Sequence, residues 1–142
     1  MNSVALPVKL LVNGSTIAGR LLVAEAEASE EEEACLLRLA FEASEFSACG
    51  PDYFEALIRL RRELEAAGIQ ILLNGASRDV WPSAMARSMG LGLKAYRMRL
   101  GHQALSSDLV PIFELHPESQ PCSIAEQEHY REQWFASLGS AA

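Results

Sequence analysis

The feature that most constrains this chain is a turn dipeptide between two apolar runs near its start. Pro7 to Leu11 is apolar and favours a strand, Asn13-Gly14 follows, and Ile17 to Val23 is apolar again. Asn and Gly adopt a positive φ at low cost, as a tight turn between antiparallel strands requires. The sequence therefore predicts an opening β-hairpin and, with it, an antiparallel sheet.

A helix with clear limits is predicted after residue 50. Gly50-Pro51-Asp52 interrupts the chain, Pro is favoured in a first helical turn, and Asp complements the positive end of the helix dipole. Gly68 is placed to end the helix. Apolar side chains recur at helical spacing on one face: Phe54, Leu57, Ile58, Leu60 and Leu64.

Between the hairpin and this helix, the sequence supports two interpretations. Glu25 to Glu33 contains six glutamates and no basic residue, so like charges repel and a solvated loop is expected. For Cys35 to Ala48, a capping box of Ser29 and Glu32 would open a helix, whereas the alternation of apolar and polar residues is typical of a strand. We take the strand.

The remaining segments predict an α+β fold. Ile69 to Leu73 is a continuous apolar run, which suits a strand buried on both faces or at a sheet centre. A short helix is expected over 83–89, and Lys94 to Leu100 is expected to return to the same sheet. Ser123, with Glu126 three residues later, predicts a capped C-terminal helix at the periphery. We expect one domain over residues 1–142: a mainly antiparallel sheet of three to five strands, one long helix on a face and a C-terminal helix.

Charge narrows the class of partner. The formal net charge is −7, and the charge is acidic in residues 1–50, basic in 51–100 and acidic again in 101–142. Phosphate contacts need clustered Lys and Arg, so nucleic acid is not expected as a partner. A net negative field favours a basic protein instead.

No membrane, metal or cofactor is predicted. No apolar run approaches the roughly 20 residues that span a bilayer, and the first residues lack a signal-peptide pattern, so a cytoplasmic location is expected. Cys35, Cys49 and Cys122 are odd in number and widely spaced, which indicates reduced, structural thiols. No histidine has a second ligand at metal-binding spacing.

Local catalytic signatures are also missing: there is no GxSxG, HExxH or GxxxxGK[ST] motif. We therefore expect no catalytic residue. A segment from Asn74 to Tyr96 remains of interest because it mixes hydrogen-bond donors, charges and an aromatic ring after a predicted strand. Two readings stay open. The segment forms a binding site, or Arg78 and Asp79 pair locally while Trp81, Met85 and Met89 cover the sheet.

Four stretches carry a resemblance to a known group of proteins. They are residues 50–61 (GPDYFEALIRLR), residues 74–90 (NGASRDVWPSAMARSMG), and Lys94-Ala95-Tyr96 with 108–113 (DLVPIF). Over roughly residues 50–115 the chain resembles the small bacterial immunity proteins that accompany secreted polymorphic toxins, including type VI and Rhs-associated ones. The resemblance implies a non-catalytic, cytoplasmic protein that binds a cognate protein toxin and occludes it.

On that reading the residues expected to bind the partner fall into two groups. The first comes from the segment after the buried strand, and the second is the end of the glutamate run. They are Arg78, Asp79, Trp81 and Arg87, and Glu30, Glu31, Glu32 and Glu33. Two alternatives remain: a small enzyme or ligand-binding domain with Asp79 as base and Arg78 or Arg87 holding an anion, and a structural subunit that forms a homodimer through an apolar patch.

Overall fold

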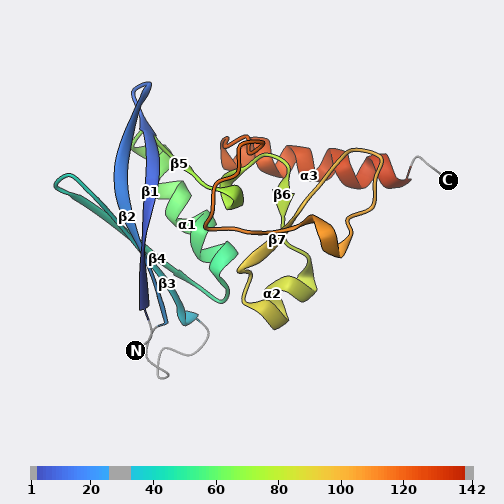
Figure 1. Cartoon of the computed structure of the whole chain (residues 1–142), viewed down its shortest axis with the longest axis horizontal. Helices are drawn as coiled ribbons and strands as arrows, with labels where there is room; N and C mark the ends of the chain where they lie inside the picture. The colour runs from blue at the N-terminus through green and yellow to red at the C-terminus, as the bar shows by residue number, and fades with distance from the viewer. Residues whose placement is uncertain (1–2, 26–32, 140–142) are drawn as a thin grey trace.

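A computed structural model describes residues 3–25 and 33–139 of the chain (Figure 1). It is an α+β fold with a curled five-stranded antiparallel sheet, a second sheet of three strands and three α-helices. The elements follow in this order: β1 (Ser3–Val12), β2 (Ser15–Glu25), β3 (Cys35–Phe41), β4 (Ser44–Gly50), α1 (Tyr53–Ala66), β5 (Ile69–Leu72), the 3-10 turn η2 (Asn74–Ala76), β6 (Val80–Trp81), α2 (Ala84–Gly90), β7 (Lys94–Arg97), the 3-10 turn η3 (Ser106–Asp108), β8 (Leu109–Pro111) and α3 (Ile124–Gly139).

The opening hairpin is confirmed. β1 and β2 pair antiparallel over their whole length, from Ser3 opposite Ala24 to Val12 opposite Ser15. The turn residues Asn13 and Gly14 have φ values of 50° and 80°, the left-handed region that this pair tolerates. The hairpin forms the inner part of the five-stranded sheet, whose order is β4-β3-β2-β1-β5.

The prediction of strand structure for Cys35 to Ala48 is confirmed, but the segment forms two strands and not one. β3 and β4 form a second hairpin, which turns at Glu42 and Ala43. Glu42 adopts φ 51° without being Gly or Asn, so the sequence carries no turn signal there. The alternation that predicted the strand is real: every second side chain of β3, from Cys35 to Phe41, is buried.

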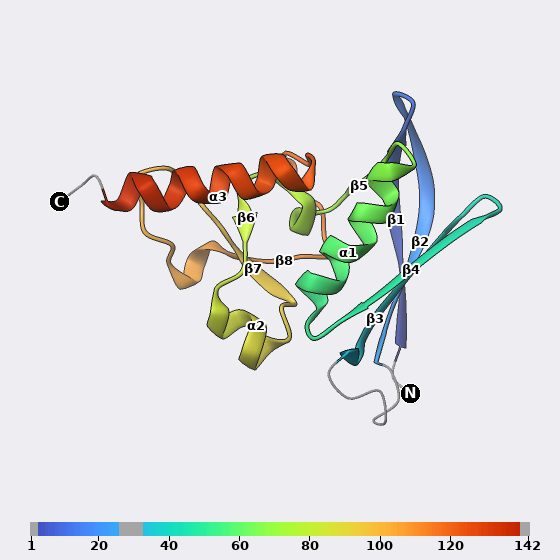
Figure 2. The same cartoon turned by 180° about the vertical axis from the view of Figure 1, so that it is seen from behind.

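The predicted helix is α1. Asp52 is its N-cap, and the Asp52 carboxylate accepts a hydrogen bond from the Glu55 backbone N–H at 2.8 Å. Gly68 follows the C-terminus with φ 76°, and its N–H donates to the Glu65 carbonyl. The apolar face of α1 packs on the curled sheet, with Phe54 and Leu60 fully buried. Figures 1 and 2 show α1 between the large sheet and the rest of the molecule.

The position predicted for β5 is wrong. The strand pairs only with β1, so it is an edge strand and does not lie at the sheet centre. Its burial alternates: Ile69 and Ile71 face the core, whereas Gln70 and Leu72 are half-buried. At the end of this apolar segment, Leu72 and Leu73 line a hollow together with Phe113.

The return of residues 94–100 to the first sheet is also wrong. β7 pairs with β6 and β8 in a separate antiparallel sheet of order β6-β7-β8. The pairing places Ala95 opposite Val110, and both side chains join the same apolar core as the first sheet and α1. Short strands with few residues give little periodicity, so their partner depends on long-range packing.

The C-terminal helix is confirmed, with its capping box. Ser123 Oγ accepts from the Glu126 N–H at 3.1 Å, and Glu126 Oε1 accepts from the Ser123 N–H at 3.0 Å. Only Ile124 and Gln127 are buried among its described residues, as expected for a peripheral helix. In both ribbon views α3 lies on one side of the small sheet and α2 on the other.

Candidate functional site

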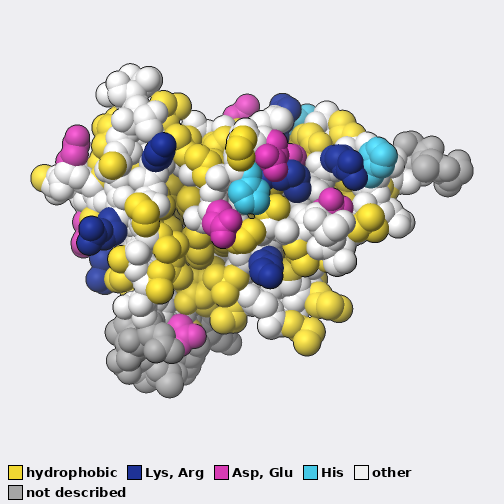
Figure 3. Space-filling model, viewed as in Figure 1, with side chains coloured by type: hydrophobic (Ala, Val, Ile, Leu, Met, Phe, Trp, Pro, Cys, Tyr) yellow, Lys and Arg dark blue, Asp and Glu magenta, His cyan; other side chains and the backbone are white. Residues whose placement is uncertain are grey.

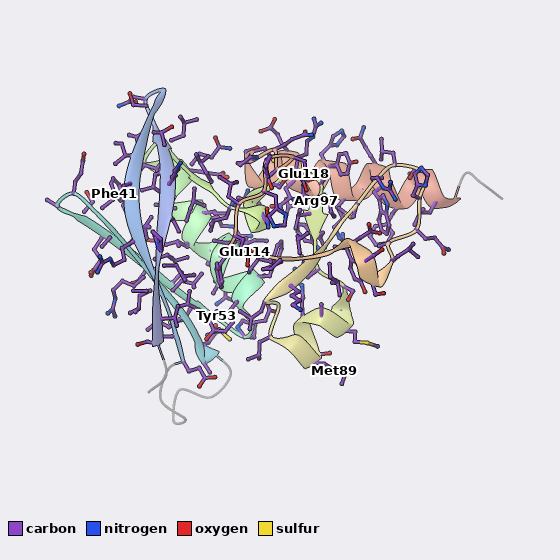
Figure 4. The ribbon with its side chains drawn as sticks, viewed as in Figure 1. Phe41, Tyr53, Met89, Arg97, Glu114 and Glu118 are labelled. Atoms are coloured by element: carbon purple, nitrogen blue, oxygen red, sulfur yellow. The ribbon has the colours of Figure 1, made fainter. Side chains whose placement is uncertain are left out.

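A buried polar cluster joins η2, β7 and the segment after β8. The Asn74 side chain is fully buried. Asn74 Nδ2 donates to the Pro111 carbonyl at 2.9 Å, and Asn74 Oδ1 accepts from Ser119 Oγ at 2.6 Å and from the His116 N–H at 3.1 Å. Figure 4 shows Arg97 beside the segment that carries Glu114 and Glu118. Asn74 therefore fastens this segment to the core.

Asp79 belongs to the same cluster. Both carboxylate oxygens lie 3.2 Å from Arg97 Nη1, and Asp79 Oδ1 also accepts from Ser77 Oγ at 2.6 Å. Arg97 Nη2 donates to Ser119 Oγ at 3.0 Å. The Asp79 and Arg97 side chains are only 17% and 14% exposed, so this ion pair is largely internal. A carboxylate held in this way is poorly placed to take a proton from a substrate.

Arg78 lies elsewhere. Its Nη2 donates to Gln120 Oε1 at 3.0 Å, and its guanidinium lies 5.5 Å from the centre of the Tyr130 ring. Arg78, Tyr130 and His129 line a hollow of about 290 Å³ on α3, at the low end of the volumes typical of ligand sites. The local pairing of Arg78 with Asp79 is not formed, since Asp79 pairs with Arg97.

Trp81 and Arg87 are brought together. The Trp81 ring packs edge-on against Phe54 of α1, with 5.0 Å between ring centres. The Arg87 guanidinium lies 5.0 Å from the Phe54 ring centre and 5.7 Å from that of Trp81, and Arg87 Nη1 lies 3.5 Å from Asp52 Oδ2. Arg87 thus ties α2 to the N-terminus of α1.

Most of the predicted glutamate run cannot be placed, because Glu30, Glu31 and Glu32 lie outside the described residues. Glu33 is described. Glu33 Oε2 lies 2.7 Å from Arg59 Nη1 of α1, and the Glu33 side chain is 47% exposed. The negative charge of Glu33 is therefore partly neutralised by an arginine of its own chain, which weakens its attraction for a basic partner.

An apolar surface on and around α2 and α3 was not predicted from the sequence. Met85 and Met89 were expected, in one reading, to cover the sheet, but they are 69% and 81% exposed. Figure 4 shows Met89 projecting from α2, and Figure 3 shows hydrophobic side chains standing out at that end. We call the following exposed set the α2–α3 face: Met85, Met89, Leu91, Leu93, Leu100, Leu105 and Phe135.

Two hollows adjoin on the α2–α3 face. The first, the α2 groove, has a volume of about 450 Å³ and is lined by Met85, Met89 and Leu93. The second, the α3 cavity, has a volume of about 510 Å³ and lies between Trp81 and α3. Ser83 and Tyr96 line both hollows, so the two meet at that point. Both volumes fall in the range of ligand and anchor pockets.

The Cys35 and Cys122 thiols are poor nucleophiles in this structure. Burial raises the pKa of Cys35 to about 11, and burial likewise raises the pKa of Cys122 to about 11. Both side chains are therefore protonated at neutral pH, and the protonated thiol is the unreactive form. Among the residues that the structure describes, no three His, Cys, Asp or Glu side chains gather as metal ligands would.

No family model and no curated protein matches the chain. Of the described helices, none combines the length and the apolar character that a membrane crossing needs.

Proposed function

We propose that this chain is a non-catalytic protein-binding protein, an immunity protein that neutralises a cognate toxin by occluding it in the cytoplasm of the producing cell. The observation that carries the proposal is the α2–α3 face. Of nine large hydrophobic side chains that are exposed among the described residues, Val4 alone precedes residue 85. Exposed apolar side chains concentrated in one part of a fold are typical of a surface that another protein covers.

The composition of the face supports a protein partner. Met85 and Met89 are unbranched and adaptable, as in surfaces that repack against a binding partner. Phe135 is a large exposed ring, and Trp81 supplies a further ring inside the adjoining cavity. Large aromatic anchors within a polar rim contribute most of the binding energy in standard interfaces of roughly 1,600 Å².

Charge supplies the second support. A net charge of −7 attracts a basic partner and raises its rate of association. Such steering depends on ionic strength, because exposed charges are screened over about 8 Å at physiological salt. We therefore expect the complex to form more slowly as salt is raised, with a smaller effect on its dissociation.

The enzyme alternative receives less support. It assigns Asp79 as a base, but that carboxylate is engaged by Arg97 and by Ser77. Of its two candidate anion holders, Arg87 is engaged by the carboxylates of Asp52 and Glu55, and Arg78 donates to Gln120 Oε1. The polar groups of the alternative thus serve contacts within the chain.

The test is co-expression with the adjacent open reading frame. We expect the wild-type chain to rescue growth and to co-purify as a stable 1:1 complex with the product of that reading frame. Absence of both rescue and complex would reject the proposed function.

A matched pair of variants locates the interface. Met89→Asp places a charge on the α2–α3 face, whereas Val4→Asp places the same charge on an exposed apolar position of β1. We expect Met89→Asp to weaken the complex at least about tenfold and Val4→Asp to leave it unchanged. The reverse order would place the interface on the large sheet.

A further inference from the structure

Arg131 differs in its contacts from the other arginines that are buried or partly buried. Arg59, Arg61, Arg87 and Arg97 each have a carboxylate, amide or carbonyl acceptor. Within the described part of the chain, Arg131 has no ion-pair partner. Its Nε is buried without a hydrogen-bond partner, as is that of Arg97, but both Nη atoms of Arg97 are bonded. The Arg131 guanidinium is held by two aromatic rings instead.

Those rings fix the cation in place. The guanidinium carbon of Arg131 lies 5.1 Å from the centre of the Trp81 ring and 4.9 Å from that of the Phe135 ring. Stacking of this kind attracts a cation to the ring faces but leaves the in-plane N–H donors of the guanidinium without acceptors. Arg131 therefore retains its capacity to bind an anion.

Arg131 lines the α3 cavity, whose volume is about 510 Å³. None of the lining residues is acidic. The walls are mainly aromatic and aliphatic side chains from β6, β7, the segment after it and α3: Trp81, Tyr96, Met98, Trp134, Phe135 and Leu138. A cavity with apolar walls and one cation suits a ligand with an apolar body and one negative charge.

The cavity is held open by hydrogen bonds between α3 and the segment after β7. Tyr130 Oη donates to the Met98 carbonyl at 3.2 Å, and Trp134 Nε1 donates to the His102 carbonyl at 2.9 Å. The Gly101 N–H donates to Ser137 Oγ at 2.8 Å. These contacts recur along one face of α3 and keep its side chains at a fixed distance from β7, so little ordering is needed on binding.

We propose that the α3 cavity binds a small amphipathic organic monoanion, a medium-chain or aryl carboxylate. Its carboxylate accepts hydrogen bonds from Arg131, and its apolar body lies against Trp81, Trp134 and Leu138. A single cation suits one carboxylate, whereas a phosphate dianion is ordinarily met by several donors. The cavity lies on the face proposed above for the protein partner, but the small-molecule test needs no toxin, so its failure and that of the proposed function can be told apart.

The experiment uses intrinsic fluorescence, because the chain has two tryptophans and both line the cavity. The full-length protein is titrated with octanoate, octanol and octylammonium below their aggregation limits. We expect a saturable change with octanoate, binding at least about tenfold weaker with octanol, and the weakest binding with octylammonium. Equal affinities for octanoate and octanol, or no saturable change with any of the three, would overturn the proposal.

Two variants test the role of Arg131. Arg131→Gln is expected to weaken octanoate binding about tenfold while leaving octanol binding unchanged. Arg62→Gln removes the same charge from an exposed position on α1 and should leave both unchanged. Circular dichroism checks that each variant folds. If Arg131→Gln does not fold, the comparison of octanoate, octanol and octylammonium on the wild-type chain tests the proposal. Unchanged octanoate binding in folded Arg131→Gln rejects the site.

Discussion

The half of the molecule built from β1–β5 and α1 differs from the half built from β6–β8, α2 and α3 in what holds its elements in place. In the first half, apolar side chains of the sheet and helix bury one another, and eight residues of α1 are buried. In the second half, α2 buries none and α3 buries two among the described residues.

Polar contacts between side chains and backbone take over in the second half. Gln127 Nε2 of α3 donates to the carbonyls of Gly75, Ser77 and Val80, at 3.0, 3.0 and 2.7 Å. Such bonds position a helix by direction and distance without requiring a wide apolar face. The difference teaches that α2 and α3 can leave apolar side chains exposed and still be fixed in place.

The largest expected effect contrasts the two halves directly. Leu60→Ala removes a fully buried side chain of α1 and should lower the free energy of unfolding by about 3–5 kcal/mol. Met89→Ala removes an exposed side chain of α2 and should change it by less than about 0.5 kcal/mol. Urea unfolding followed by circular dichroism measures both. A comparable loss in the two variants would remove the distinction between the halves.

The second prediction concerns the polar attachment of α3. Gln127→Ala removes a donor from three buried carbonyls, although the Ser77 carbonyl keeps the Val80 N–H. It also deprives Arg61 Nη1 of its acceptor, Gln127 Oε1. We expect a loss of about 2–4 kcal/mol, because buried polar groups left without partners keep their desolvation penalty. Gln133→Ala, at an exposed position one turn and a half further along α3, is the matched control and should be nearly neutral. A neutral Gln127→Ala would mean that α3 is held by apolar packing.

The two halves also differ in how much of their fold could be predicted from the sequence. The hairpin turn at Asn13-Gly14 and the capping box of Ser123 and Glu126 are local devices, and both were identified correctly. The start of α1 was also located, but Asp52 is its N-cap and Pro51 precedes the helix. The signal of these devices lies within a few residues, so neighbours in sequence decide the structure. The turn at Glu42, by contrast, depends on the pairing of β3 with β4.

The second half is decided by contacts between distant residues. β7 joins β6 and β8 instead of the first sheet, and Met85 and Met89 of α2 are exposed. Periodicity reports that a segment has an apolar side but does not say what meets it. The sequence therefore singled out Trp81 as a candidate binding residue but did not associate Arg131 with it.

The candidate site shows the same limit. Arg131 and Phe135 are four residues apart on a predicted helix, which is the spacing of neighbours on a helix surface. That spacing was available from the sequence. Trp81 stands fifty positions earlier, and only the packing of α3 against β6 brings it to 5.1 Å from the Arg131 guanidinium.

A third prediction compares buried thiols from the two halves. Folding holds the pKa of Cys35 on β3 and of Cys122 before α3 at about 11, against an ordinary value of 9.0. Between pH 9 and 11 the unfolded chain loses thiol protons that the folded chain keeps, so the free energy of unfolding falls as pH rises. After allowance for solvent screening, we expect about 1 kcal/mol from each thiol.

Urea midpoints at pH 8.5 and 10.5 measure this loss. Cys35→Ala and Cys122→Ala should each reduce the difference between the two midpoints, and the double variant should reduce it further. Burial raises the pKa of Tyr53 to about 12, so a smaller loss from this side chain should remain in the double variant. An alkaline loss that is the same in all four proteins would assign it to other groups.

The smallest expected effect sharpens the comparison at the helix ends. Ser123→Ala removes one side of the α3 capping box and should cost about 0.5–1 kcal/mol. Because α3 buries few side chains, we expect the loss to appear locally, as faster hydrogen exchange at the amides of its first turn, while the amides of α1 keep their protection. Asp52→Ala is the counterpart on α1, and it also removes the carboxylate that faces Arg87. Its effect should therefore reach α2 as well. If Ser123→Ala instead accelerates exchange throughout α1, the two halves open as one cooperative unit, and the α2–α3 face shares the stability of the core.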